Sequence, residues 1–252
     1  MATTAIITTI ATGGTIMSKE RYRYPQLALL RLQSWLSPAF PTGSYSYSHS
    51  LEWAVEAGFI KDRESLVDWL EADLCYGSIR NEAIFFCEGW CSARDNDSAK
   101  LLEIAELAAA FRGTSEFALE SSQQASACRA TLRQVWPDRL LDSLSQLLSQ
   151  REVPPVLAVI LGVRSAREGV PISLALSAFL QSYVANLVTA GVRLIPLGQT
   201  DGQLAIAALE EAVLTASARA RNATTDDLGS AAFMVDLASM AHETQYTRLF
   251  RS

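Results

Sequence analysis

Apolar residues recur at intervals of three and four positions along most of this chain, a spacing that places them on one face of an α-helix. The pattern begins at Leu27, and Asp62 and Thr114 stand where helix N-caps are expected. No segment sustains the alternation of apolar and polar residues that is typical of a half-buried strand. The sequence therefore predicts an all-α protein. Helices are expected at about residues 27–36, 50–57, 62–90 with a bend near Gly77, 98–111, 114–135, 138–149, 154–167, 172–190, 201–221 and 228–241.

Two details of this pattern carry expectations of their own. Thr200 and Gln203 have the spacing of a capping box, which places a helix start close to them. Residues 192–197 could pass for a strand, but one strand makes no sheet, and Pro196 weakens the interpretation further. We expect a single-domain helical bundle of about eight to ten helices over residues 27–252.

The first 26 residues lack the helical spacing. Residues 1–26 contain five threonines between Thr3 and Thr12, followed by a charged and aromatic run that ends at Pro25. We expect an irregular, flexible N-terminal tail here, and Met17 is a plausible alternative start of the chain.

The expected helix at residues 172–190 is apolar on more than one face. Its apolar residues include Leu174, Leu176, Phe179, Leu180, Tyr183, Val184, Leu187 and Val188. A helix at the surface of a globular protein carries a single apolar stripe, so this one is expected at the centre of the fold or at a subunit interface.

Composition narrows the classes of function. Apolar residues make up 49% of the 252 residues, which is enough for a large core. The formal net charge of −6 argues against nucleic acid as a ligand, because phosphate binding needs clustered cations. The longest apolar run, residues 153–163, is shorter than the roughly 20 residues of a membrane-spanning helix. Four cysteines in a chain of this length make no disulfide framework, so we expect a cytoplasmic protein that binds no membrane.

Residues suited to catalysis or to metal binding are scarce. The chain has two histidines, His49 and His242, so a self-contained site with several histidine ligands is impossible. Cys87 and Cys91 lie four positions apart and would share a helical face, but no second pair completes a zinc site. We expect these cysteines to pack as small apolar residues. We assign no catalytic residue, no cofactor-binding residue and no metal ligand.

One short stretch offers an enzymatic alternative. Residues 9–16 resemble the N-terminal signature of bacterial-type L-asparaginases, in which the threonine after paired glycines is the nucleophile. The resemblance would make Thr15 attack an amide carbonyl. No α/β alternation follows it, and the second motif and the lysine of that family are missing. The paired glycines at 13–14 also lack the Gly-Lys-Ser/Thr ending of a phosphate-binding loop. A threonine-nucleophile amidohydrolase stays an unlikely alternative.

Three segments stand out by their mixture of polar, aromatic and glycine residues, and they cover residues 38–52, 197–203 and 242–252. The last segment contains tyrosine, arginine and phenylalanine, and tyrosine and arginine are enriched in the energetic centres of protein–protein interfaces. A chain end is usually mobile unless something holds it. We expect this segment either to bind a partner protein or to dock Leu249 and Phe250 on the chain's own core.

At these segments the sequence resembles the UreF family of urease accessory proteins. Residues 37–52, 196–202 and 242–252 match the motifs of that family, in order and at about the right distances. The resemblance covers about residues 29–252, and residues 1–28 match nothing that is associated with the family. It implies an all-helical, usually dimeric protein without enzymatic activity of its own.

The resemblance also implies partners. Members of the family join a UreD/UreH-type protein and a UreG-type GTPase in a complex on apo-urease, where GTP hydrolysis accompanies nickel delivery to the urease active site. Nickel and GTP would then be handled by the partner proteins, and this chain would have no cofactor of its own. The dimer surface is thought to receive the GTPase. The C-terminal residues of the family dock on the UreD/UreH-type partner, and here they are Gln245, Tyr246, Arg248, Leu249, Phe250 and Arg251.

Two further sets of residues carry the resemblance. In the loop at 37–52, which we call the signature loop, they are Pro41, Gly43, Tyr45, Ser46, Tyr47, His49 and Glu52. In the stretch at 196–202, the second motif, they are Gln199, Thr200, Asp201 and Gly202.

The residue types of the signature loop suggest two roles. Tyr45 and Tyr47, together with Gly43, can form a rigid amphipathic patch. His49 and Glu52 lie about one helical turn apart and could line a polar path or stabilise the start of a helix. A generic helical adaptor unrelated to nickel is the other alternative, and urease genes beside this one would decide against it.

Overall fold

The computed structural model describes residues 25–251, and every regular element in this part of the chain is helical. The all-α prediction is therefore confirmed. Residues 1–24 of the tail expected at 1–26, Thr15 among them, lie outside the described residues, and residues 25–26 are not part of a tail because they begin α2. The described part contains twelve α-helices, more than the eight to ten expected, and two short 3-10 helices. They are α2 (Pro25–Leu36), η1 (Ser44–Ser46), α3 (Leu51–Glu56), α4 (Arg63–Tyr76), α5 (Ser78–Asp95), α6 (Ser98–Ala110), α7 (Ser115–Val135), α8 (Arg139–Gln150), α9 (Leu157–Arg167), α10 (Ile172–Leu194), α11 (Gln199–Ala208), α12 (Glu210–Ala220), η2 (Thr225–Asp227) and α13 (Phe233–His242).

Side chains fix the helix starts that the sequence predicts. Asp62 caps α4, because its carboxylate accepts the backbone N–H of Ser65 at 2.9 Å and the hydroxyl of Ser65 accepts the N–H of Asp62 at 3.1 Å. Thr114 caps α7 by accepting the N–H of Phe117 at 3.1 Å. Helix α2 begins at Pro25, two residues before the expected start, because proline suits the first position of a helix.

Two expectations about the C-terminal third are wrong in detail. The single helix expected at 201–221 is divided at Leu209 into α11 and α12. Helix α11 begins at Gln199, and its cap is the N–H of Gly198 donated to the carboxylate of Asp201 at 3.2 Å, not a Thr200–Gln203 box. Residues 192–194, half of the possible strand, form the last turn of α10.

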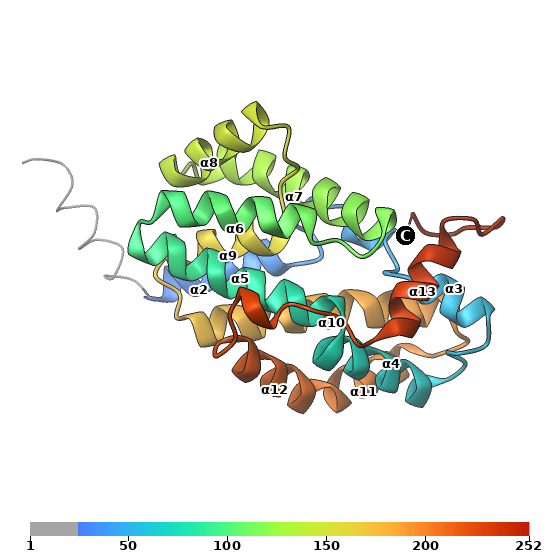
Figure 1. Ribbon diagram of the computed structural model, residues 1–252. Helices are drawn as coiled ribbons and strands as arrows, with labels where there is room; N and C mark the ends of the chain where they lie inside the picture. Colours follow the sequence, from blue (N-terminus) through green and yellow to red (C-terminus); the bar gives the residue numbers. More distant parts are fainter. Residues whose placement is uncertain (1–24, 252) are drawn as a thin grey trace, which may run out of the picture.

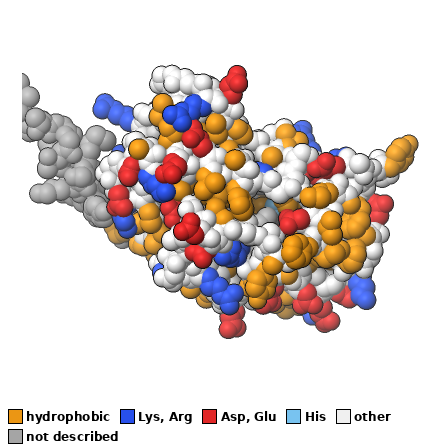
Figure 2. All heavy atoms as spheres, in the orientation of Figure 1, with side chains coloured by type: hydrophobic (Ala, Val, Ile, Leu, Met, Phe, Trp, Pro, Cys, Tyr) orange, Lys and Arg blue, Asp and Glu red, His pale blue; other side chains and the backbone are white. Residues whose placement is uncertain are grey.

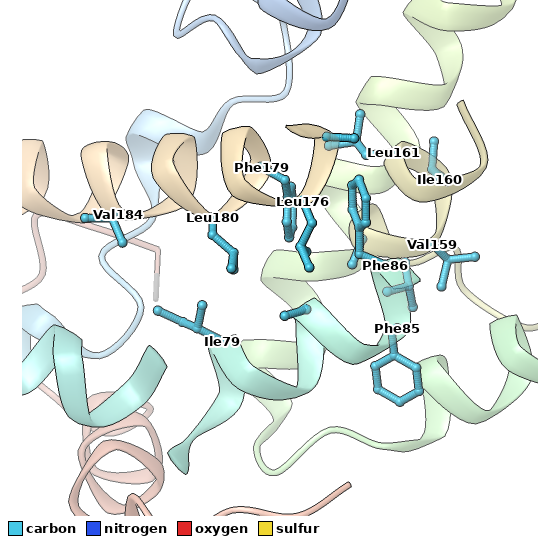
Figure 3. Packing of buried hydrophobic residues seen from close by; sticks show 14 of the residues in the cluster. Ile79, Phe85, Phe86, Val159, Ile160, Leu161, Leu176, Phe179, Leu180 and Val184 are labelled. Atoms are coloured by element: carbon cyan, nitrogen blue, oxygen red, sulfur yellow. The ribbon is translucent and has the colours of Figure 1, made fainter. Parts of the chain in front are cut away.

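Helix α10 lies at the centre of the fold, as its apolar composition predicts. It packs against α2, α3, α4, α5, α9, α11 and α12, and Figure 1 shows it running behind α5 and above α11 and α12. By length and composition alone α10 would also suit a membrane span. Helices pack around it on several sides, as they do around a core helix of a globular protein. Phe179 of α10 stacks on Phe86 of α5 with ring centroids 5.1 Å apart, and Figure 3 shows Leu176 and Leu180 pointing the same way.

Glycine allows α5 and α9 to pack backbone against backbone. A Cβ built on Gly162 of α9 would lie well under 3.0 Å from the carbonyl oxygen of Phe86, and one on Gly89 of α5 would lie 3.1 Å from that of Val159. This close approach brings Phe86, Val159 and their neighbours into one apolar layer beneath α10 (Figure 3).

Candidate docking site

The signature loop is buried from Tyr47 onwards, and its two tyrosines face different ways. Tyr47 is 2% exposed, and its hydroxyl donates to the side-chain oxygen of Gln123 on α7. Tyr45 is 69% exposed and lies at the surface. Gly43, with a φ of 75°, makes the left-handed turn that precedes η1. The two tyrosines therefore do not share one patch, and only Tyr45 is accessible to a partner.

The C-terminal segment, residues 243–251, folds back onto the signature loop. The N–H of Arg251 donates to the carbonyl of Ser46 at 2.8 Å, and in Figure 1 the C-terminus lies beside the loop that precedes α3. The ring of Phe250, 4% exposed, lies under the guanidinium of Arg193 at 4.3 Å. Arg193 also donates to the carbonyl of Tyr45 at 2.9 Å, so one side chain of α10 joins the loop to the segment.

The carboxylate of Glu52 holds the main chain of this segment. One oxygen accepts the N–H of Leu249 at 2.6 Å, and the other accepts the N–H of Phe250 at 2.9 Å. The second oxygen also lies 3.2 Å from Nε2 of His242, the last residue of α13. Glu52 is 7% exposed and His242 is fully buried, so this grip is part of the protein interior.

Glu116 of α7 completes the arrangement around His242. Its carboxylate lies 2.8 Å from Nδ1 of His242, and it accepts from the guanidinium of Arg248 at 3.0 Å. Glu116 faces Nδ1 of His242 and Glu52 faces Nε2. Burial raises the pKa of Glu116, and the charges of His242 and Arg248 oppose that rise. Two carboxylates, one imidazole ring and one guanidinium therefore meet at this point in the protein interior.

The grip leaves other side chains of the segment at the surface. Tyr246 is fully exposed and Leu249 is 66% exposed, whereas Phe250 next to it is buried. Helix α13, which leads into the segment, also exposes the apolar residues Phe233 and Leu237. Figure 2 shows apolar side chains gathered over the end of the molecule that carries α3 and α13. The expectation that Leu249 and Phe250 dock on the core together therefore holds for Phe250 alone.

His49 is at the centre of a second buried cluster. Its Nδ1 lies 3.1 Å from Glu120 of α7 and 3.2 Å from the hydroxyl of Tyr183. Its Nε2 lies 2.6 Å from the hydroxyl of Ser78 and 3.5 Å from Asp73. Burial alone would lower the pKa of His49, but the charge of Glu120 and the hydrogen bonds with Asp73 and Glu120 raise it to about 10. His49 is therefore a buried cation at neutral pH.

His49 also borders a cavity that is partly open to the surface. The cavity has a volume of about 300 Å³, and Glu120, Gln124, Phe179 and Tyr183 are among the residues that line it. The same four residues line a second cavity of about 240 Å³ towards the signature loop. Of the two residues that were expected to line a polar path or stabilise a helix start, His49 lies at a cavity wall and Glu52 grips the C-terminal segment instead.

The second motif lies in another part of the fold. Gln199 and Thr200 are exposed in the first turn of α11, and Asp201 caps that helix. Asp201 also lies 3.6 Å from Arg63 of α4, and Gly202 is buried against α10. The motif therefore joins α11 to α4 and α10, away from the Glu52 and His242 cluster.

Within residues 25–251, no group of three or more histidine, cysteine or acidic residues is arranged to hold a metal ion. Cys87 is buried, and burial together with the nearby Cys91 and Glu88 raises its pKa to about 12, so it is a protonated thiol at neutral pH.

The comparisons with known proteins agree on one family. The model of the family described as UreF matches residues 60–210. A urease accessory protein UreF of Rhodopseudomonas palustris (strain BisB5) is 48% identical over 225 residues, which cover 89% of this chain and 91% of that protein. This chain belongs to the UreF family. UreF proteins of Bradyrhizobium diazoefficiens and Granulibacter bethesdensis are 47% and 46% identical over 89% of this chain, and the matches cover 92% and 94% of those proteins.

Membership in the UreF family gives this chain a role in urease maturation, as an accessory protein of the chaperone type. The second motif and Glu116 lie within the residues that the UreF model matches, whereas Glu52 and His242 lie outside them. Sequence reasoning missed Glu116, Gln123 and Arg193, the helix residues that receive the loop and the C-terminal segment. The one signal concerns Glu116: His242 falls within a motif, and a buried histidine requires an acceptor.

Proposed function

We propose that this protein is a scaffold for urease maturation. It holds a UreD/UreH-type accessory protein and a UreG-type GTPase on apo-urease, where GTP-dependent nickel insertion takes place. The observation that carries the proposal is the C-terminal segment, which is fixed to the helical body by its main chain while Tyr246 and Leu249 remain exposed. Family membership supports the biological setting.

A segment of this kind is suited to docking because its main chain already has a fixed conformation before a partner binds. Binding a disordered tail costs the entropy of fixing it, and a segment that is held in place avoids that cost. Tyrosine and arginine are enriched among residues that dominate interface energies. Tyr246, Leu249 and the exposed Arg248 and Arg251 are therefore the residues that we assign to the contact with the UreD/UreH-type protein.

The remaining parts of the proposal follow from the family. We place the protein in the cytoplasm as a homodimer, with nickel and GTP bound by its partners. Both histidines of the chain are bound to carboxylates inside the protein, which supports a scaffold that leaves the metal to other proteins.

The docking role is tested best with residues that the fold does not need. Deleting the C-terminal segment would take the amides of Leu249 and Phe250 from Glu52 and the guanidinium of Arg248 from Glu116, so a deletion confuses folding with binding. Tyr246→Ala and Leu249→Ala remove exposed side chains only. Leu214→Ala, which removes a leucine that is 61% exposed on α12, is the matched control.

We expect each of the two segment variants to weaken binding to the purified UreD/UreH-type protein by about tenfold or more, measured by titration calorimetry, with helical content unchanged. The Leu214 variant should bind like the wild type. Wild-type affinity in both segment variants would contradict the docking role. A pull-down of the wild type with the GTPase and the urease apoprotein, with and without GTP and nickel, tests the scaffold itself.

A further inference from the structure

We propose that Glu52 is a positioning residue for partner docking. Its carboxylate holds the main chain at Leu249 and Phe250, and this grip turns Leu249 outward as part of a preformed contact surface. The inference rests on the docking role proposed above and adds to it the residue that sets the conformation of the segment.

The first argument is the target of the grip. Glu52 bonds two consecutive backbone N–H groups, Leu249 at 2.6 Å and Phe250 at 2.9 Å, and touches them through different oxygens. Two bonds to adjacent amides fix the direction of the main chain as well as its position. The side chains of the two residues then point apart, with Phe250 4% exposed and Leu249 66% exposed. An acceptor of main-chain N–H groups thus decides which side chain a partner meets.

The second argument is the rigidity of the support. Glu52 lies in the first turn of α3, and His242 ends α13, the helix that leads into the segment. His242 lies 3.2 Å from Glu52 and 2.8 Å from Glu116, so α3, α7 and α13 meet at one imidazole ring. Because Glu52 is fixed to α3 and to His242, its carboxylate stays in place if the C-terminal segment is released from it.

The third argument is the cost of release. A buried carboxylate is strongly destabilising unless its oxygens are hydrogen-bonded or paired with charge. Glu52 is 7% exposed, and the amides of Leu249 and Phe250 supply two of its contacts. Release of the segment also separates Arg248 from Glu116, which lie 3.0 Å apart. Both effects favour the closed segment in the free protein, and a partner then binds a conformation that is already populated.

The test uses Glu52→Gln, which keeps the shape of the side chain and removes its charge. Glu64→Gln is the matched control, because Glu64 is exposed on α4. The first readout is the hydrogen-exchange rate of the Leu249 and Phe250 amides in the full-length protein. The second readout is the affinity for the UreD/UreH-type protein. Far-UV circular dichroism checks that each variant is folded.

We expect Glu52→Gln to raise exchange at both amides to about the rate of the exposed Tyr246 and to weaken partner binding by about tenfold, because most molecules then have the segment released. Glu52→Asp, which keeps the charge on a shorter side chain, should recover part of both effects. The Glu64 variant should match the wild type. A merely structural role of Glu52 would lower overall stability and leave these two amides no more affected than the amides of α13.

The wild type supplies a measurement that needs no variant. The amides of Leu249 and Phe250 should exchange at least about a hundredfold more slowly than that of the exposed Tyr246, and equal rates would overturn the proposal. Loss of the protection of both amides with unchanged affinity in Glu52→Gln would also overturn it, since the conformation that Glu52 holds would then not serve docking. If Tyr246→Ala weakens binding while Glu52→Gln changes neither readout, the positioning role fails and the docking role stands. If Glu52→Gln speeds exchange and no segment variant affects binding, the docking role itself fails.

Discussion

The stability of this protein should depend on pH through His49 in a way that one substitution removes. In the folded protein the charge of Glu120 and the hydrogen bonds with Asp73 and Glu120 outweigh burial and raise the pKa of His49 to about 10. In the unfolded chain a histidine titrates near 6.5. Between these two values the folded protein keeps a proton that the unfolded chain has lost. The stabilisation by His49 is therefore complete below about pH 6.5 and is lost as the pH rises towards 10.

The magnitude follows from the linkage between protons and folding. One proton that is bound only in the folded state lowers the free energy of unfolding by about 1.4 kcal/mol for each pH unit. Between pH 7.0 and 8.5 the wild type should thus lose on the order of 2 kcal/mol from this group. His49→Gln should be less stable at pH 7.0 by about 3 kcal/mol, because it leaves the carboxylates of Asp73 and Glu120 without their cation.

Urea denaturation at pH 7.0 and 8.5, followed by circular dichroism, measures both quantities. The buried thiols of Cys87 and Cys128 have raised pKa values and also reduce stability at the upper end of this range, but they do so equally in both proteins. The difference between the two pH dependences therefore isolates His49. Equal losses in wild type and variant would refute the assignment of His49 as a buried cation.

Two further substitutions test the packing that positions the site. Gly162→Ala places a Cβ against the carbonyl of Phe86, so thermal or chemical denaturation should show a loss of about 3 kcal/mol, whereas Gly229→Ala, which meets open space, should be nearly neutral. Thr114→Ala removes the cap of α7 and the 2.7 Å hydrogen bond to Ser239 of α13, so denaturation should show a loss of about 1–2 kcal/mol, and unchanged stability would mean that water replaces both contacts.

The helices could be predicted because their determinants are local. Apolar spacing marks the buried face of each helix, and caps such as Asp62 and Thr114 act within one turn of the residue that they serve. The division at Leu209 was not predictable in this way, because residues 201–221 keep a helical composition on both sides of it. The start of α11 was misplaced because Thr200 and Gln203 have the spacing of a capping box, whereas the structure uses the carboxylate of Asp201 and the backbone N–H of Gly198, a residue without a polar side chain.

The candidate site depends on contacts between distant parts of the chain, and residue types alone indicate its members without their pairing. Composition marked the signature loop and the C-terminal segment as unusual, yet nothing local joins Glu52 to Leu249 or Arg193 to Phe250. The second motif, equally distinctive in sequence, proved to be a helix start beside α4 and α10. A motif therefore identified a place where the chain has special requirements, and only the fold showed whether that requirement was a cap or a contact surface.

The two histidines show why a chain so poor in histidine uses them in the interior. Each ring has both nitrogens bound within the protein, His49 between Glu120 and Ser78 and His242 between Glu116 and Glu52. Each joins segments that lie far apart in the sequence, and each lies at or next to a non-helical segment, His49 within the signature loop and His242 before the C-terminal segment. A metal ion at either ring would have to replace a contact with a buried carboxylate, at the cost of the contacts that order the loop and the C-terminal segment. The same chemistry that would make these residues metal ligands elsewhere therefore serves here to hold the signature loop and the C-terminal segment in place.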